Sequence, residues 1–322
     1  MIELKNIRLY HECPVPLSRI AETYALAYGR PFWADYWTWR FLCNPFSDRV
    51  YIACLLEEDV LASYYAVSPA RLLIRGQGEY KVALSNMTMT HPTYRGRGCF
   101  REVAQVLLEQ LEQDGYLGVF GFANHRSHYG FRKYLNWRDL FVTTLFTLRR
   151  EKTVNCIRVA YGGPLFEQGP VDLQILREAT ELSYSGLPVS LQRSYEGLKW
   201  RLFDHPRQKY RYLRIRRGDA TGILFYKRYG QAIDIMEFFY AGEPGPTGGK
   251  LLAEAAASLA TTEDRDINLW SNFHSQEHLY LERAGFEESA FSGYFGFIPL
   301  SKDADIPNPE EWHIRFLDSD VY

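Results

Sequence analysis

A chain of 322 residues has room for two domains, since compact domains typically take roughly 100–200 residues each. Hydrophobic residues make up 46% and charged residues 24% of the sequence, which is the balance of a folded globular protein. The 37 basic and 39 acidic residues nearly cancel, and a formal net charge of -2 argues against a nucleic acid or an anionic membrane as the partner.

Three further features restrict the kind of protein. No run of about 18–20 apolar residues is present, and the first residues lack the apolar core of a signal peptide, so we expect a cytoplasmic protein without membrane contact. The five cysteines show no C-x-x-C spacing, which predicts reduced thiols and no metal site. The aromatic content of 16% fits either aromatic cores or a ligand groove lined with rings.

The hydrophobic pattern of the first half predicts two helices, a series of hairpin strands, and then alternating helices and strands. Pro45 ends the second helix, because proline cannot continue one. Between Gly98 and Leu111 apolar residues recur at helical spacing, as in a helix that packs on a sheet. The predicted helices are 17–28, 33–42, 98–111 and 126–135, and the predicted strands are 50–56, 60–74, 80–90, 117–122 and 138–148.

The second half repeats this order of elements. A Trp-Arg pair followed by two apolar residues and a proline occurs at 39–45 and again at 200–206. An asparagine follows the fourth predicted strand of each half, at Asn124 and at Asn272, with a serine three residues later. The predicted helices of this half are 172–184, 191–203, 249–260 and 275–283, and its predicted strands are 210–216, 221–226, 232–240, 267–270 and 288–299.

These patterns predict an α+β fold made of two copies of one unit, each a mostly antiparallel twisted sheet flanked by helices. We expect the first domain at 1–150, a linker rich in glycine and proline at 151–171, and the second domain at 172–300. Large apolar residues alternate at 312, 314 and 316, so the segment 301–322 is expected to contain a half-buried strand that docks on a sheet.

The most informative segment is the turn between the strand that ends at Thr90 and the helix that follows it. Gly96 and Gly98 carry no side chain, so the backbone there can approach a ligand closely. Free amides at a helix N-terminus favour an anion such as a diphosphate, and Arg95 and Arg97 add positive charge. No Gly-Lys-Ser/Thr and no G-x-G-x-x-G is present, which excludes the common nucleotide-hydrolase and dinucleotide patterns.

This turn resembles the cofactor loop of the Gcn5-related N-acetyltransferase (GNAT) superfamily, Arg/Gln-x-x-Gly-x-Gly/Ala. The matching residues are Pro92, Tyr94, Arg95, Gly96 and Gly98, whereas Phe100 stands where the family usually has glycine or alanine. Asn124, Ser127 and the pair Asn136-Trp137 match a second family segment with one extra residue in between. The resemblance covers residues 15–150 well and 170–300 weakly, and it makes the second copy a degenerate GNAT-like domain.

The resemblance implies that acetyl-CoA is bound as co-substrate and that its acyl group passes directly to a primary amine of a small molecule. Backbone groups at the end of the strand 80–90 would contact the pantetheine arm, and amides of the turn would hold the diphosphate. The cofactor-binding residues implied by the resemblance are Met89, Thr90, His91, Arg95, Gly96, Arg97, Gly98, Cys99, Phe100, Asn124 and Ser127.

The resemblance also implies a general acid, commonly a tyrosine in the helix after Asn124. The position that corresponds by counting is Arg132, whose guanidinium stays charged and cannot serve as a proton donor. Tyr129, Tyr134 and His128 lie nearby on the same helix, and we favour Tyr129.

The general base is left open between water, His91 and a carboxylate from elsewhere in the chain. Asp234 and Glu237 lie on the strand of the second copy where the family often has a catalytic acidic residue, and Glu237 is the candidate retained, although a carboxylate that only faces water explains it as well. The loop at 242–250 has no arginine, so the second copy is expected to have lost strong CoA binding.

Two other classes of function remain open at this point. One is a transferase that takes an aminoacyl group from charged tRNA, as the tandem Fem-type enzymes do, although the near-neutral charge does not indicate a tRNA surface. The other is a non-catalytic acyl-CoA-binding or scaffold protein. We expect a monomer or homodimer that binds no nucleic acid and no membrane.

Overall fold

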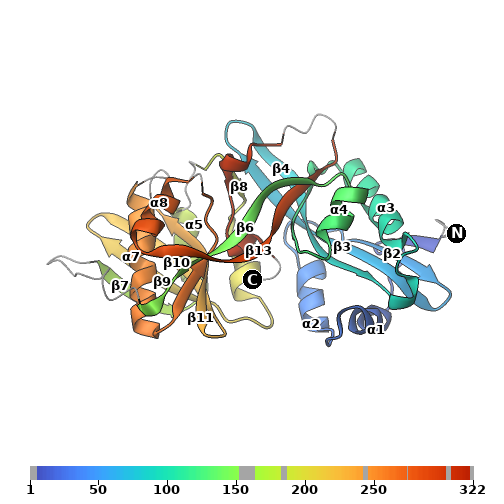
Figure 1. Cartoon of the computed structure of the whole chain (residues 1–322), viewed down its shortest axis with the longest axis horizontal. Helices are drawn as coiled ribbons and strands as arrows, with labels where there is room; N and C mark the ends of the chain where they lie inside the picture. Colours follow the sequence, from blue (N-terminus) through green and yellow to red (C-terminus); the bar gives the residue numbers. More distant parts are fainter. Residues whose placement is uncertain are drawn as a thin grey trace. The chain divides into compact units, whose positions relative to one another are not determined.

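The computed structural model describes residues 6–151, 164–182, 187–241, 246–273, 275–301 and 306–319, and its chain divides into two compact units (Figure 1). Unit 1 consists of Met1–Leu72, Glu79–Phe141 and Gly293–Ile306. Unit 2 consists of Leu73–Gly78, Val142–Ser292 and Pro307–Tyr322. No helix among the described residues has both the length and the hydrophobicity needed to cross a membrane.

Unit 1 is a sheet in the order β1-β2-β3-β4-β5-β13, in which β4 and β5 run parallel. Helices α3 and α4 cover one face of this sheet, and α1 and α2 cover the other (Figure 1). The strands are β1 (Ile7–Leu9), β2 (Tyr51–Glu57), β3 (Val60–Ile74), β4 (Gly78–Thr90), β5 (Gly118–Ala123) and β6 (Arg138–Leu148), and the helices are α1 (Leu17–Tyr28), α2 (Ala34–Trp37), α3 (Cys99–Gln113) and α4 (His128–Tyr134).

The core of unit 1 has two layers because strand side chains point alternately to the two faces of the sheet. On β2, Ala53 and Leu55 pack with α3 and α4, whereas Ile52 and Cys54 pack with α1 and α2. The predicted apolar stripe of α3 is confirmed, since Val103, Ala104, Leu107 and Leu111 are all buried.

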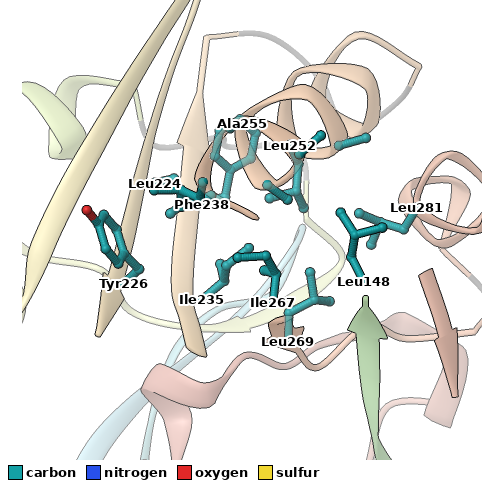
Figure 2. Packing of buried hydrophobic residues seen from close by; sticks show 14 of the residues in the cluster. Leu148, Leu224, Tyr226, Ile235, Phe238, Leu252, Ala255, Ile267, Leu269 and Leu281 are labelled. Carbon is teal, nitrogen blue, oxygen red and sulfur yellow. The ribbon is translucent and has the colours of Figure 1, made fainter. Parts of the chain in front are cut away.

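Unit 2 is a sheet in the order β13-β6-β12-β11-β10-β9-β7, in which β11 and β12 run parallel. The strands are β7 (Leu165–Pro170), β8 (Val189–Leu191), β9 (Arg211–Arg217), β10 (Ala220–Tyr229), β11 (Ala232–Tyr240), β12 (Asp266–Leu269), β13 (Phe286–Pro299) and β14 (Trp312–His313), and the helices are α5 (Leu173–Glu181), α6 (Tyr195–Leu198), α7 (Pro246–Glu263) and α8 (Gln276–Arg283). Figure 2 shows how leucine and alanine side chains of α7 pack on Phe238 and Ile235 of β11.

The mixed fold predicted from the sequence is confirmed, and the two halves share an unusual local feature. The segments with the Trp-Arg pair form π-helical turns, Thr38–Leu42 after α2 and Lys199–Phe203 after α6. Arg40 and Arg201 are buried in these turns, at 3% and 5% exposure. The predicted helices 33–42 and 191–203 are therefore shorter as α-helices than expected, because each widens into a π-helix.

The last strand of each predicted copy is divided between the units. In unit 1, β13 pairs with β5 through Tyr294–Pro299. In unit 2, β6 pairs with β12 through Phe146–Leu148. The compact units are consequently not contiguous halves of the chain, unlike the domains expected at 1–150 and 172–300. A local hydrophobic pattern indicates that a strand exists, but it does not indicate which neighbour the strand pairs with.

The segment expected as a linker, 151–171, contains a strand. Residues 165–170 form β7, which pairs with β9, while residues 152–163 lie outside the described part of the chain. The expected C-terminal strand is confirmed in part, because among the described residues 306–319 the strand comprises Trp312 and His313 only, in parallel pairing with β8. Cys13, Cys43, Cys54 and Cys99 are free thiols, and Cys156 is not among the described residues.

A buried lysine in unit 2 leads to a prediction about stability and pH. Lys227 is 4% exposed and lies opposite Asp234 across the β10–β11 pair. Burial lowers the pKa of Lys227 to about 8, against an opposing effect of Asp234. Because the unfolded chain then binds more protons than the folded chain above about pH 8, the free energy of unfolding should rise between about pH 8 and 9.5. Urea denaturation at a series of pH values should show this rise in the free energy of unfolding in the wild type and a smaller rise in the Lys227→Met/Asp234→Asn double variant.

Candidate functional site

The turn between β4 and α3 is open where the sequence predicts a phosphate cradle. Gly96 has φ +76° and Gly98, the N-cap of α3, has φ +83°. Both conformations lie in the left-handed region that favours glycine, and a Cβ built on either residue would meet no atom within 4 Å. The first amides of a helix have no intrahelical partner, and no side chain caps this N-terminus. The turn therefore offers unshielded N–H groups to an anion.

The strands beside this turn separate before they end. β4 and β5 pair from Val82 with Gly118 to Leu84 with Phe120, but β4 continues to Thr90. Backbone groups on this edge of β4 are thus available to something other than β5, and the carbonyl of Thr88 accepts a hydrogen bond of 2.6 Å from the Tyr28 hydroxyl. Of the strand-end residues predicted to contact the cofactor, Met89 is 3% exposed, so only its backbone can do so.

The side chains of the turn are held by the protein itself. His91 caps the short helical turn at Pro92–Tyr94, with Nδ1 2.8 Å from the Thr93 hydroxyl, which agrees with a turn role better than with a base. Arg95 donates to the carbonyl of Ala27 at 3.2 Å, and the guanidinium of Arg97 lies over the ring of Tyr94 at 5.1 Å. Each guanidinium group thus has a contact within the protein, Arg95 with α1 and Arg97 with the turn itself.

Cys99 and Phe100 are held by the protein itself, and the Cys99 thiol donates to the carbonyl of Tyr94 in the turn. Cys99 is 2% exposed, and burial raises the pKa of its thiol. The Phe100 ring stacks on Phe131 of α4 at 5.7 Å, within the core layer between α3 and α4. Phe100, which departs from the family pattern, therefore packs its side chain in the core, while its backbone amide stays at the turn.

Asn124 and Ser127 shape the end of β5. The side-chain oxygen of Asn124 accepts hydrogen bonds from the amides of Arg126 and Ser127, at 2.9 and 3.2 Å, and the Ser127 hydroxyl accepts one from the amide of Asn124. These contacts turn the chain into α4. The Asn124 oxygen is therefore used locally, and its amide NH2 is the group left to contact a ligand.

The candidate acids on α4 differ in their surroundings. Tyr129 is 65% exposed, and its hydroxyl accepts a hydrogen bond of 3.0 Å from the Lys133 ammonium. Tyr134 is 42% exposed, and the centroid of its ring lies 5.3 Å from the same Lys133 ammonium. Arg132 lies 3.4 Å from a carboxylate oxygen of Asp139, so it serves as an ion-pair partner.

His128 lies in a contact that the sequence reasoning missed. Its Nε2 is 2.6 Å from Oδ1 of Asp139, and its ring stacks on Tyr294 with centroids 3.8 Å apart. Asp139 was not singled out because it stands eleven residues away, on the next strand, and no motif connects it to His128. The polar pair Arg138-Asp139, which follows the Asn-Trp pair, was the only available signal.

In unit 2, the chain's own C-terminal segment lies where the corresponding strands separate. β11 and β12 pair only from Ala232 to Asp234, and β11 continues to Tyr240. Asn272, the counterpart of Asn124, donates to the carbonyls of Pro309, Glu310 and Trp312 at 2.9–3.3 Å. Residues 242–245 of the corresponding loop lie outside the described residues.

Glu237 is buried in this part of unit 2 rather than facing water. It is 1% exposed and lies 2.7 Å from Arg193 and 3.6 Å from Arg315. Burial alone would raise the pKa of Glu237, but Arg193, His313 and Arg315 together hold it well below its usual range. Burial raises the pKa of the neighbouring Asp318, which also contacts Arg193. This arrangement fits an ion-pair cluster that fastens the C-terminal segment.

A cavity of about 300 Å³ adjoins this cluster within unit 2. Leu191 and Phe239 line it together with Ser190, Ser194 and His313. Glu237 borders the cavity, but its oxygens are already engaged by Arg193 and by the amide of Phe238. The described residues of the chain contain no group of three or more His, Cys, Asp or Glu side chains suited to a metal ion.

Comparison with known proteins identifies the class of this fold. The described structure is similar to a GCN5-related N-acetyltransferase from Kribbella flavida, with a TM-score of 0.63 at 14% identity, over 92% of this chain and 73% of that one. A probable N-acyltransferase of unknown function from Enterococcus faecalis gives a TM-score of 0.69 at 12% identity, with the same coverage. Eis1 from Mycobacterium abscessus gives 0.59 at 13% identity, over 92% of this chain and 74% of that one.

Residues 17–138 match the family model of the acetyltransferase (GNAT) domain. No curated protein matches the chain. The chain therefore carries a GNAT acetyltransferase domain in the segment that contains the glycine turn, and the resemblance drawn from the sequence is confirmed.

Proposed function

We propose that unit 1 transfers an acyl group from an acyl-CoA, in the simplest case acetyl-CoA, to a primary amine of a small molecule. The observation that supports this most is the open turn at Gly96 and Gly98, which lies at the N-terminus of α3 beyond the point where β4 leaves β5. The residues fit the cofactor, since the uncapped N-terminus of α3 adjoins an unfilled space beside Gly98 and the same turn carries two arginines.

In this proposal the chain's residues bind and orient the reactants. Amides of the turn hold the diphosphate, and the unpaired edge of β4 aligns the pantetheine arm so that the thioester meets the amine. Holding both reactants in place supplies much of the rate enhancement of a two-substrate reaction. Direct attack by the amine agrees with the burial of Cys99, because a buried thiol with a raised pKa is a poor nucleophile.

Tyr129 is the proposed acid that protonates the departing thiolate. Its hydroxyl is accessible, and the hydrogen bond from Lys133 stabilises the phenolate that remains after proton transfer. Glu237 is proposed as a structural residue of unit 2, since its carboxylate is already paired.

The direct test is release of free thiol from acetyl-CoA in the presence of an amino sugar, a polyamine, an amino acid and a peptide amine. Thiol release with at least one amine, together with a matching N-acetylated product, would support the proposal. CoA binding by calorimetry without release would favour a non-catalytic acyl-CoA-binding protein. A salt-dependent gel shift with charged tRNA would favour aminoacyl transfer.

Replacing Tyr129 by phenylalanine should lower kcat by about 100-fold, because the acid is removed, and should leave the affinity for CoA within about two-fold. The matched control is Tyr134→Phe, which removes a hydroxyl beside the same lysine from the same helix. Equal kcat values for the wild type and Tyr129→Phe would exclude Tyr129 as the acid.

A further inference from the structure

We propose that His128 is the base that accepts the proton of the attacking amine and that Asp139 is the residue that positions it. This inference rests on the proposed acyl transfer in unit 1 and adds the residues that handle the amine proton. It is carried by a contact between α4 and β6 for which the sequence shows no motif.

Asp139 is held in place and in turn holds the imidazole. Its Oδ1 lies 2.6 Å from Nε2 of His128 and accepts a second hydrogen bond, of 2.9 Å, from the indole of Trp137. Its Oδ2 lies 3.4 Å from Nε of Arg132. Because a carboxylate can only accept, Nε2 of His128 must carry the proton, and Nδ1 of the neutral ring is then the free lone pair.

Tyr294 fixes the plane of this imidazole. The two rings are stacked at 3.8 Å with an angle of 8° between their planes. Tyr294 lies on β13 and pairs in register with Ala123, the last residue of β5. Carboxylate and stacked ring together leave the imidazole one orientation, which is what a proton acceptor in a fixed reaction geometry requires.

His128 is linked by its backbone to Asn124, a residue of the proposed cofactor site. Its amide donates to the carbonyl of Asn124 at 3.0 Å, so the two residues stand on successive turns of one short segment. Asn124 directly follows β5, beyond the positions where β5 pairs with β4. The His128 side chain is 17% exposed, which leaves an edge for a ligand while most of the ring is shielded from water.

The ionisable groups around His128 come from three elements. Asp139 and Arg132 form the ion pair described above, and on α4 the neighbouring Tyr129 and Lys133 face solvent together. The His125 ring lies edge-on to Tyr294, the residue on which His128 stacks, with the two ring centroids 5.9 Å apart. His128 has a carboxylate fixed on one ring nitrogen, which leaves the other nitrogen of its neutral form to accept a proton.

In the proposed step, the amine nitrogen forms a bond to the acyl carbon and the carbon–sulfur bond of the thioester breaks, which gives an amide and the CoA thiolate. The proton lost by the nitrogen goes to Nδ1 of His128, and Tyr129 gives its hydroxyl proton to the thiolate. The imidazolium then returns a proton to the Tyr129 phenolate through water, so the net products are the amide and CoA thiol.

The test compares His128→Gln and Asp139→Asn with His125→Gln, a control from the same segment that also contacts Tyr294. His128→Gln should lower the rate of thiol release by about 100-fold or more, and Asp139→Asn by about 10- to 100-fold, with CoA affinity unchanged. Added imidazole should restore part of the rate to His128→Ala, which loss of a structural contact would not allow.

A readout without an acceptor completes the test. In histidine ¹⁵N NMR, His128 should show the tautomer with the proton on Nε2, and its signals should shift when acetyl-CoA is added. Asp139→Asn should change that tautomer. Unshifted His128 signals in a protein saturated with acetyl-CoA would overturn this inference alone, whereas absence of CoA binding in the wild type would overturn the proposed function.

Discussion

Replacing Gly98 by valine is expected to weaken the binding of acetyl-CoA by more than about 100-fold, to the point where calorimetry detects none. Gly98 has φ +83°, a conformation that a β-branched residue adopts only with strain. The space beside it is empty to 4 Å, so the new side chain would enter the position expected for the diphosphate. The backbone strain and the side chain in the diphosphate position therefore both weaken the binding of acetyl-CoA.

Gly115 provides a matched control for the strain. It stands just beyond the other end of α3 with φ +76°, and a Cβ there also meets nothing within 4 Å. Gly115→Val should lower stability to a similar extent as Gly98→Val but should keep CoA binding. Unchanged affinity in a folded Gly98→Val variant would refute the assignment of this turn to the cofactor, and with it the proposed transferase.

Replacing Glu237 by alanine is expected to reduce the free energy of unfolding by about 3–5 kcal/mol. The change would remove a carboxylate that lies within 3.6 Å of both Arg193 and Arg315, and would leave these largely buried guanidinium groups with Asp318 and Glu277 as their remaining carboxylate partners. Losing one partner of a buried pair is costly because the remaining charge can no longer be compensated by water. Urea denaturation monitored by circular dichroism measures the difference.

An exposed ion pair serves as the comparison for Glu237. Asp59 pairs with Arg19 at 2.6 Å but is 93% exposed, so Asp59→Ala should cost less than about 1 kcal/mol. A loss below about 1 kcal/mol for Glu237→Ala as well would show that the cluster does not stabilise unit 2.

The acid dependence of stability gives a second measurement on Glu237. Its folded-state pKa is depressed, so its contribution is present above the unfolded value of 4.5 and is lost as the pH falls below it. Asp318, whose pKa burial raises, acts in the opposite direction. The difference in stability between the wild type and Glu237→Gln should therefore shrink as the pH falls below about 4.5.

The two units show why similar patterns need not give similar sites. In both units a parallel pair of strands separates after three paired positions, and an asparagine follows the second strand. In unit 1 the turn beside this point is open at Gly98, whereas in unit 2 Asn272 binds the backbone of the C-terminal segment. A degenerate second copy agrees with this contact, which no comparison of the two sequences could have shown.

The sequence by itself determined the parts that depend on short-range pattern. The stripe of α3 and the Gly96–Gly98 bend follow from residue spacing and from the backbone freedom of glycine, which act within a few residues. The mixed fold and its GNAT domain follow from these patterns in register.

The tertiary structure alone decided which distant segments meet. It assigned β13 to β5, set Asp139 against His128, and buried Glu237 under the C-terminal segment. The physical reason is that strand pairing and ion pairing depend on the path of the backbone between the partners, and residue spacing along the chain does not record that path.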